Sequence, residues 1–348
     1  VRVVTMNAFP FGDFHGRQVK HRVYLPDWST TERRDYTLRL ATLLAHLEPG
    51  RSSASISTVP IGWPMQPDPA PTIHAAADRL VEAASVLAEL RERTGVAVHV
   101  DLEPEPGCLL QRSADVVAFF ERALLPAAVR QGVSAETVSE FIGVCHDVCH
   151  AAVMFEGQAR CLTNYADAGI RVGKVQVSSA IEARFAPDDA PGAARTVRRL
   201  RAFAEDRYLH QTMMRGDDGA LAFYEDLPEA LATVDAGRVP SGAWRTHFHV
   251  PVFLECADGA DRSRAPATLG QDGLPDAPCL FTTHDQVDEA LGSVRRLGFD
   301  PAIEVETYAW GVLPESLQPD SLAEGIAEEL RWTAGRLKAS GWSTQLMA

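Results

Sequence analysis

The sequence lacks a long apolar run, because no stretch of about 18 consecutive apolar residues occurs in its 348 residues. It also has only six cysteines, without the dense spacing of a secreted disulfide scaffold. Its first residues, Val1–Asn7, have the pattern of a strand, with no charged segment followed by an apolar one. We therefore expect no membrane span, no signal peptide, reduced thiols and a cytoplasmic location.

The sequence also has fewer basic than acidic residues, with 33 Lys and Arg against 47 Asp and Glu, which gives a net charge of -14. This mean charge would repel a nucleic-acid backbone unless a local patch reversed it. The basic cluster at residues 195–201 has the spacing of a solvated helix face. We therefore expect no nucleic-acid partner, while the oligomeric state is left open.

Short runs rich in Val and Ile alternate with helical patterns, which is typical of strand–helix units around a parallel sheet. Two intervening segments, Thr72–Thr94 and Ser113–Gln131, have apolar residues at helical spacing. Eight strands with covering helices favour a closed (β/α)8 TIM barrel over an open doubly wound sheet. The eight predicted strands are Arg2–Ala8, Ala54–Ile61, Ala97–Glu103, Phe141–Cys145, Arg171–Ser178, Thr246–Phe253, Cys279–Thr283 and Ala302–Tyr308.

The count of eight predicted strands also predicts the domain organisation. Length alone permits one or two domains, and eight strands favour a single barrel domain over residues 1–348. Residues 185–243 are polar with a helical pattern, and we predict a helical insertion on the catalytic face. Residues 257–278 are rich in Gly, Pro and Asp and are predicted to form a loop. Either segment is a candidate lid.

Polar residues follow several strands at the end where a barrel builds its active site. On the third strand, Asp101 and Glu103 share one face, with Glu103 nearer the rim. After the fourth, Asp147 and His150 are three residues apart and can converge on one ion as the strand enters a helical turn. Taken alone, these pairs are also explained by solvated loop acids and by a helix cap followed by a core histidine.

Three further strands supply residues of the ligand type. Gln176 interrupts an apolar strand, where its amide needs an ion, a substrate hydroxyl or the backbone as partner. His247 and His249 share a face by period two, a usual arrangement for first-row metals. Glu304 and Glu306 do the same on the last strand, with Glu306 at the rim. So many donors at one end predict a divalent metal site (Mn2+, Mg2+ or Zn2+) held by Glu103, Asp147, His150, Gln176, His249 and Glu306.

The four elements Leu102-Glu103, Asp147–His150, the Gln176 strand and Glu306-Thr307 resemble the xylose-isomerase-like barrel superfamily of sugar isomerases, epimerases and endonuclease IV-type enzymes. This resemblance implies a barrel of the sugar-isomerase type. Gln176 stands where that family usually has His, which favours Mn2+ or Mg2+ unless His150 or His249 compensates.

Longer motifs are similar to the EboE proteins of the Ebo metabolite-traffic gene clusters. This second resemblance implies a place near enzymes of prenylated or cyclitol-like metabolite assembly, and it implies no particular substrate. The motifs occupy residues 7–16, 23–28, 55–63, 101–110 and 173–180.

Our leading hypothesis is a metal-dependent isomerase or epimerase that acts on a small polyhydroxylated carbonyl compound. Glu103 and Glu306 are the expected catalytic carboxylates, which remove and return a proton. Two alternatives remain: metal-dependent phosphoester hydrolysis of a small molecule, and a non-catalytic barrel that binds a metabolite. The expected substrate-binding residues are His15, Lys20, Trp28, Trp63 and His247, although simple loop packing explains the two tryptophans equally well.

Overall fold

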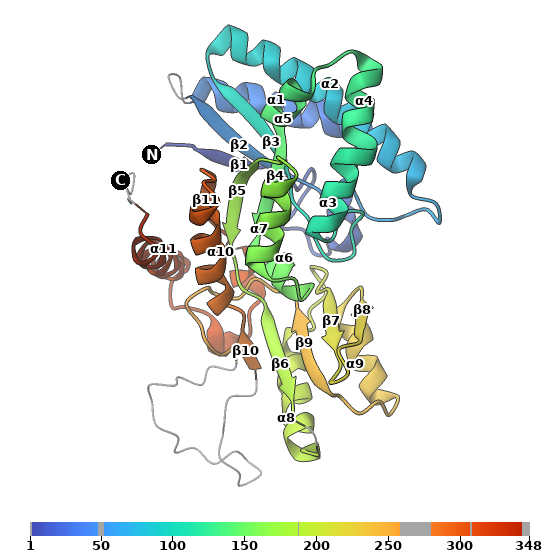
Figure 1. The fold of residues 1–348 in the computed structure, drawn as a ribbon. Helices are drawn as coiled ribbons and strands as arrows, with labels where there is room; N and C mark the ends of the chain where they lie inside the picture. Colours follow the sequence, from blue (N-terminus) through green and yellow to red (C-terminus); the bar gives the residue numbers. More distant parts are fainter. Residues whose placement is uncertain (1, 48–51, 187, 258–279, 307, 343–348) are drawn as a thin grey trace.

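The structure is a computed structural model that describes residues 2–47, 52–186, 188–257, 280–306 and 308–342. Within these residues, six strands form a parallel sheet in the order β1-β2-β3-β4-β5-β11 (Figure 1). The strands β2 to β5 are almost entirely buried, as expected for Val- and Ile-rich strands covered on both faces. The bounds are β1 (Thr5–Asn7), β2 (Ser53–Thr58), β3 (Ala97–Leu102), β4 (Ile142–Asp147), β5 (Val172–Val177) and β11 (Ala302–Val305).

This sheet curls into the wall of a barrel. Strands β2 and β5 are separated by two other strands, yet Lys174 Nζ donates a hydrogen bond to Ser57 Oγ at 3.1 Å. In a flat sheet these strands would lie about 14 Å apart, because neighbouring strands are about 4.8 Å apart. The predicted α/β-barrel fold is therefore confirmed, with β1 and β11 as the two edges of the sheet in the described part of the chain.

Helices cover the outside of the parallel sheet (Figure 1). In α2, Leu80, Ala84 and Leu87 recur at helical spacing and are fully buried. Within the described ranges, no helix combines the length and apolar character that crossing a bilayer requires. The covering helices are α1 (Thr31–Leu47), α2 (Ala70–Thr94), α3 (Ser113–Phe119), the π-helix η2 (Phe120–Leu124), α4 (Leu125–Gln131), α5 (Ala135–Phe141), α6 (Val148–Val153), α7 (Gln158–Asp167), α10 (Asp285–Arg296) and α11 (Leu322–Ala339).

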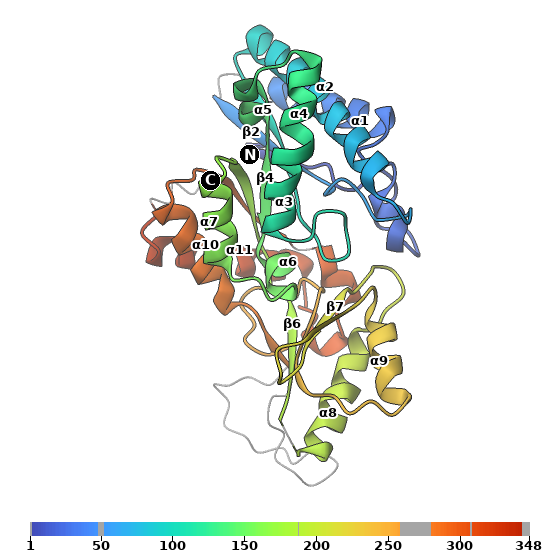
Figure 2. The same cartoon turned by 45° about the vertical axis from the view of Figure 1, so that its right-hand side comes forward.

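A second, antiparallel sheet extends from the carboxyl end of the barrel (Figures 1 and 2). Only three residues separate β5 from β6, so the chain passes directly from one sheet to the other. The second sheet has the order β10-β6-β9-β7-β8 and its own apolar core. Its elements are β6 (Ile181–Phe185), α8 (Ala190–Leu200), η3 (Arg201–Phe203), β7 (Thr212–Arg215), β8 (Leu221–Tyr224), α9 (Leu227–Asp235), β9 (Gly242–Thr246) and β10 (Leu280–Thr282).

The segment 185–243 therefore differs from the helical insertion that the sequence predicts, because it also contains strands. A hairpin joins β7 to β8 through Asp218 and Gly219, and Gly219 has a φ of +82°. An Asp-Gly pair between two strand patterns is a strong hairpin indicator, which the helical periodicity on either side obscured. The single-domain assignment for residues 1–348 stays a prediction.

Two of the eight predicted barrel strands lie outside the parallel sheet. The run Thr246–Phe253 is irregular after β9 ends at Thr246, because His249 has a φ of +49° and Pro251 has no N–H to donate. The run Cys279–Thr283 contains β10, which pairs antiparallel with β6. Cys279 and all but Ala257 of the predicted loop at residues 257–278 lie outside the described residues.

Short 3-10 helices complete the described chain. Two of them contribute residues to the lining of the cavity described below, at residues 20–24 and at Tyr308. They are η1 (Lys20–Tyr24), η4 (Tyr308–Val312) and η5 (Glu315–Leu317).

Candidate metal centre

A cavity of about 400 Å³ opens where the parallel strands end. Glu103 directly follows β3, Glu306 directly follows β11, and Asn7 is the last residue of β1. The opposite side is formed by the segment after β1 and by the irregular segments that precede β7 and follow β9. The titratable lining residues are Glu103, Glu105, Glu304, Glu306, His15, Lys20, Tyr24, His150, Tyr208, His247, His249 and Tyr308.

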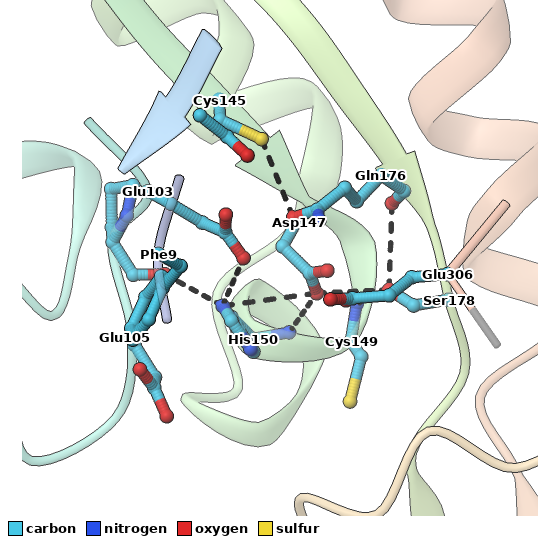
Figure 3. Close-up of polar contacts among 12 residues, drawn as sticks. Phe9, Glu103, Glu105, Cys145, Asp147, Cys149, His150, Gln176, Ser178 and Glu306 are labelled. Carbon is cyan, nitrogen blue, oxygen red and sulfur yellow. Dashed lines mark hydrogen bonds and ion pairs between the residues drawn. The ribbon is translucent and has the colours of Figure 1, made fainter. Parts of the chain in front are cut away.

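Three carboxylates from three parallel strands converge beside this cavity (Figure 3). One oxygen each of Glu103, Asp147 and Glu306 lies within 4.8 Å of the other two. The atoms Glu103 Oε2, Asp147 Oδ2 and Glu306 Oε2 are buried and have no hydrogen-bond partner in the described part of the chain. Because a buried charge without a partner is costly, this group requires protons, a cation or a charged imidazole beside it.

Asp147 serves two purposes with its two oxygens. Its Oδ1 accepts hydrogen bonds from the backbone N–H of His150 at 2.8 Å and from Ser178 Oγ at 2.9 Å, and so caps α6. Its Oδ2 is left for the carboxylate group. The helix-cap explanation and the ligand explanation of the Asp147–His150 spacing are therefore compatible.

His249 adds an imidazole to the three carboxylates. Its Nδ1 lies 2.8 Å from Glu306 Oε2, and its Nε2 lies 4.0 Å from Asp147 Oδ2. Neither ring nitrogen is in hydrogen-bond geometry with a described residue. The positive φ of His249 is a strained conformation for a residue other than glycine, and such strain is concentrated at functional sites. His247 and His249 thus approach the site from an irregular segment and not, as predicted, from one face of a strand.

His150 lies next to this group, but one of its nitrogens is already in use. Its Nδ1 lies 3.8 Å from Glu103 Oε1 and 3.9 Å from Asp147 Oδ1, while it donates to the Pro104 carbonyl at 3.0 Å. The Nδ1 of His150 therefore carries a proton and offers no lone pair to an ion beside the carboxylates. Its Nε2 faces His247.

Gln176 lies on the strand next to Asp147, and its side chain reaches toward Cys145 (Figure 3). Its Oε1 accepts a hydrogen bond from Cys145 Sγ at 3.4 Å, whereas its Nε2 has no partner within the described residues. Behind it, Lys174 Nζ is fully buried, contacts Glu304 and donates to Ser57. Lys174 therefore places one positive charge beneath the carboxylates.

The electrostatics of the group favour the protonated form of Glu103 over that of Asp147. Burial, followed by the charges of Glu306 and Asp147, raises the pKa of Glu103 well above its usual value. Burial also acts to raise the pKa of Asp147, but His150 and His249 outweigh it and lower that pKa. The pKa values of two neighbouring acids in one site are thus shifted in opposite directions, as is common where carboxylates take different roles.

The predicted substrate-binding residues divide into two sets. His15, Lys20 and His247 line the cavity, and Lys20 is paired with Asp226. Trp28 and Trp63 are buried and do not line it. The Nε1 of Trp28 donates to Thr58 Oγ1 at 3.1 Å, and Trp63 packs on Tyr24 with ring centroids 5.0 Å apart. The packing explanation therefore holds for both tryptophans.

Several site residues were not predicted from the sequence. Glu105 and Tyr308 each stand two residues after a predicted catalytic glutamate, and this period-two spacing was the available indication. Tyr24 and Gln211 bond to Glu105 at 2.8 Å each, although they are distant in sequence. Nothing in their local sequence pattern indicates this contact.

No family model and no curated protein matches the chain. Some solved structures are remotely similar to it. The 3-keto-D-glucoside 4-epimerase of E. coli is 12% identical, over 96% of this chain and 80% of that one, with a TM-score of 0.39. The IOLI protein with a bound zinc atom is 11% identical, over 99% and 78%, with a TM-score of 0.42. A xylose isomerase domain protein from Alicyclobacillus acidocaldarius is 16% identical, over 97% and 77%, with a TM-score of 0.41.

Proposed function

We propose that the protein is a metal-dependent isomerase or epimerase of a neutral, polyhydroxylated carbonyl compound. The observation that supports this proposal is the convergence of Glu103, Asp147, His249 and Glu306 at the carboxyl end of the barrel strands. In barrel enzymes this end is the site of catalysis. Residues with buried, unpartnered polar atoms at that end are difficult to explain by packing alone.

The donor set of these four residues fits a divalent ion. Each offers an atom without a hydrogen-bond partner among the described residues, and three carboxylates with one imidazole suit Mn2+ or Mg2+. When bound, such an ion polarises the carbonyl of the substrate. Gln176 has an amide nitrogen free instead of its oxygen, so we place it beside the ion site and not in it.

Glu103 and Glu306 are the proposed proton carriers. They come from β3 and β11, line the same cavity and offer oxygens within 4.8 Å of each other. Isomerisation next to a carbonyl needs one group that removes a proton and one that returns it. Burial, followed by Glu306 and Asp147, raises the pKa of Glu103, so we assign the return of the proton to Glu103 and its removal to Glu306.

The cavity favours a neutral substrate. Lys20 is the only lysine or arginine among the described lining residues, and Asp226 already neutralises it. Apart from the proposed metal ion, an anionic substrate would therefore meet no free lysine or arginine in the described lining. Phe14, Tyr208 and Tyr308 lie with ring centroids 5.0 to 5.4 Å apart and provide aromatic faces for the carbon skeleton. A cyclitol or sugar within a metabolite biosynthesis or trafficking pathway, as the EboE-like motifs imply, meets these requirements.

A second candidate function is metal-dependent phosphoester hydrolysis of a small molecule. It is favoured by the number of overlapping ligand groups at the cavity, because two-metal sites catalyse such reactions. The pairing of Lys20 with Asp226 counts against it, since the described lining then has no free lysine or arginine for a phosphate.

An exchange experiment tests the proposal. The full chain, loaded with Mn2+ or Mg2+, is incubated in heavy water with a panel of ketoses, aldoses and keto-cyclitols, and deuterium uptake is measured by mass spectrometry. We expect uptake at the carbon next to the carbonyl in at least one compound, and loss of uptake in Glu306→Gln. Glu315→Gln, an exposed change in the same C-terminal segment, is the control that keeps the exchange.

The contrary outcomes are also specific. Phosphate release from small phosphoesters without deuterium uptake would replace the proposal with the hydrolase. Binding of a compound with neither reaction would assign the chain to the non-catalytic metabolite-binding barrels.

A further inference from the structure

The cavity beside the carboxylates has two chemically different walls. One contains the acids at the strand ends and the imidazoles described above. The other, which we call the apolar wall, comes from the segment after β1 and from the residues before β7. The proton-transfer chemistry proposed above uses none of its residues. The members of the apolar wall are Phe9, Pro10, Phe14, Val19, Val23, Tyr208 and Leu209.

Hydrogen bonds hold the two halves of the apolar wall together. The backbone N–H groups of Val19 and Lys20 both donate to the Arg207 carbonyl, at 2.7 and 3.1 Å. Tyr208 Oη donates to the Phe14 carbonyl at 3.3 Å, which joins residues 194 positions apart in the sequence. The apolar wall is therefore built by the fold and is a fixed part of the cavity.

Polar side chains next to the apolar wall are already engaged. Lys20 Nζ is paired with Asp226, and Tyr24 Oη donates to Glu105 Oε1 at 2.8 Å. His15 is the exception, and it is exposed to solvent. Substrate hydroxyls placed on this wall would lose their hydrogen bonds to water without replacement, which is unfavourable. The part of a substrate that lies there is therefore expected to lack hydroxyl groups.

An apolar group would gain affinity from the same wall. Each methylene that moves from water to an apolar surface tightens binding by about threefold to fourfold. The cavity also has room for such a group beside a polyol. Its volume of about 400 Å³ lies within the range of roughly 300 to 1,000 Å³ that accommodates drug-sized ligands, which are larger than a single sugar ring.

We propose that the substrate is a polyol that carries an apolar substituent of several carbon atoms. The polyol head binds beside Glu103 and Glu306, and the substituent lies on the apolar wall. The place of the head rests on the proposed isomerase function, whereas the place of the substituent rests on the apolar wall alone. A free sugar or cyclitol leaves that wall in contact with water, so we expect it to bind more weakly than its alkylated form.

A series of n-alkyl probes tests this proposal without turnover. The probes are methyl, butyl, hexyl and octyl β-D-glucosides and the matching ethers of myo-inositol, because neither head has a free carbonyl to react. Calorimetric titration of the full chain, loaded with Mn2+, measures each dissociation constant below the concentration at which the probe forms micelles. We expect one site per chain and roughly threefold tighter binding for each added methylene until the wall is filled. The heat-capacity change of binding should become more negative with chain length.

Val23→Thr is the test variant, because it keeps the shape of the side chain and adds a hydroxyl to the apolar wall. Val23 is half-buried in the 3-10 helix η1. We expect this variant to reduce the preference for octyl over methyl by at least about fivefold. Val129→Thr is the matched control, since Val129 is 80% exposed on α4 and absent from the described cavity lining. Circular dichroism and thermal unfolding identify variants that fold, and Leu209→Asn replaces Val23→Thr if the latter does not.

Equal affinity at all chain lengths, or no binding by any member of either series, overturns the proposal. A folded Val23→Thr that keeps the full preference for octyl does so too. An equal loss in Val129→Thr would place the alkyl chain on the exposed surface and not in the cavity. The proposed function fails separately, because absence of deuterium exchange with an intact chain-length dependence removes the isomerase and leaves the apolar wall. Exchange without a chain-length dependence does the reverse.

Discussion

The two sides of the cavity are built by different means. The barrel side contributes carboxylates at the ends of regular parallel strands, with Glu103 after β3 and Glu306 after β11. The side of the second sheet contributes His247 and His249 from an irregular segment after β9, where His249 has a φ of +49°. Backbone pairing places the first set, whereas His247 is held by a side-chain hydrogen bond to Gln211 and His249 by its local backbone conformation.

The pairing register of the strands therefore positions the carboxylates, whereas local contacts and local backbone conformation position the imidazoles. In the barrel, Asp147 is paired with Gln176 and Gln176 with Glu304, so the strand ends are aligned by the sheet itself. His247 instead depends on Gln211 at 2.7 Å. We therefore expect changes on the barrel side to affect the reaction most, and changes on the other side to affect mainly ion binding.

The largest effect is expected for Glu306→Gln. The amide keeps the shape and one carbonyl ligand but removes the charge and the basic oxygen. We expect the variant to fold, to keep some metal at saturating ion, and to lose at least about 10²-fold in rate, the lower end of what general acid–base catalysis supplies. Deuterium exchange at saturating Mn2+ measures this loss.

His249→Ala is the companion variant from the other side of the cavity. We propose that His249 binds the ion and transfers no proton. A higher metal concentration should therefore partly restore the exchange rate of His249→Ala. Unchanged exchange in Glu306→Gln at saturating metal would show that the last strand does not carry the proton. The two-glutamate mechanism would then be wrong, although the metal site would stand.

The sequence predicted the barrel side well. The Val- and Ile-rich runs identified β1 to β5 and β11, and the rule that a barrel builds its site at the strand ends brought Glu103 and Glu306 together. It could not predict that the run Thr246–Phe253 leaves the sheet, because an apolar alternating run has the same pattern in a strand and in a buried irregular segment. Pro251 was the one local indication.

For the irregular segment after β9, the sequence predicted which residue types bind the ion but not where they lie. His247 and His249 were identified as metal-binding candidates, but their predicted placement on one strand face was wrong. The partners that orient them, such as Gln211, lie on elements whose position depends on how the second sheet packs on the barrel. Such long-range placement is not encoded in a local pattern, so Glu105 and Gln211 were missed.

The next largest effect is expected for Lys174→Met, which removes a positive charge inside the barrel. Lys174 is fully buried beneath the carboxylates and pairs with Glu304. Burial acts to lower the pKa of Lys174, but Cys145 and Glu304 raise it, so the amine is charged. Lys174→Met should cost about 3 kcal/mol of unfolding free energy in urea, because it removes a fully buried cation from the Ser57 hydroxyl and from Glu304, whose side chain is 34% exposed. Adding Glu304→Gln should recover part of this loss. A double variant as unstable as the single one would contradict the charge argument.

A smaller effect is expected from the hydrogen bonds by which Glu329, on helix α11, holds the segment that follows β9. Glu329 of α11 accepts from the Val252 backbone at 3.1 Å and from Trp310 Nε1 at 3.0 Å. Burial raises the pKa of Glu329 from 4.5 to about 7. Folding therefore favours the protonated acid, and this stabilisation is complete below about pH 4.5 and lost as the pH rises through about 7.

Glu329→Gln should remove this dependence. We expect the wild type to lose roughly 2 kcal/mol more than the variant between about pH 5 and about pH 8, measured by urea unfolding. Glu324→Gln, an exposed change on the same helix, is the control that keeps the wild-type slope. Parallel pH profiles for wild type and Glu329→Gln would refute this assignment.

The smallest effect is expected for an ion pair on the outside of the second sheet. Arg201 pairs with Asp235, and their side chains are 43% and 61% exposed, in contrast to Lys174 in the barrel. Water already solvates both groups of the exposed pair, so holding them together gains little beyond the entropy that it costs. Arg201→Met should therefore change the unfolding free energy by less than about 1 kcal/mol, and added salt should reduce even that change. Both methionine variants are measured in the same urea series. A loss in Arg201→Met equal to that in Lys174→Met would mean that the barrel interior does not strengthen its ion pair, and the contrast between the two regions would then rest on geometry alone.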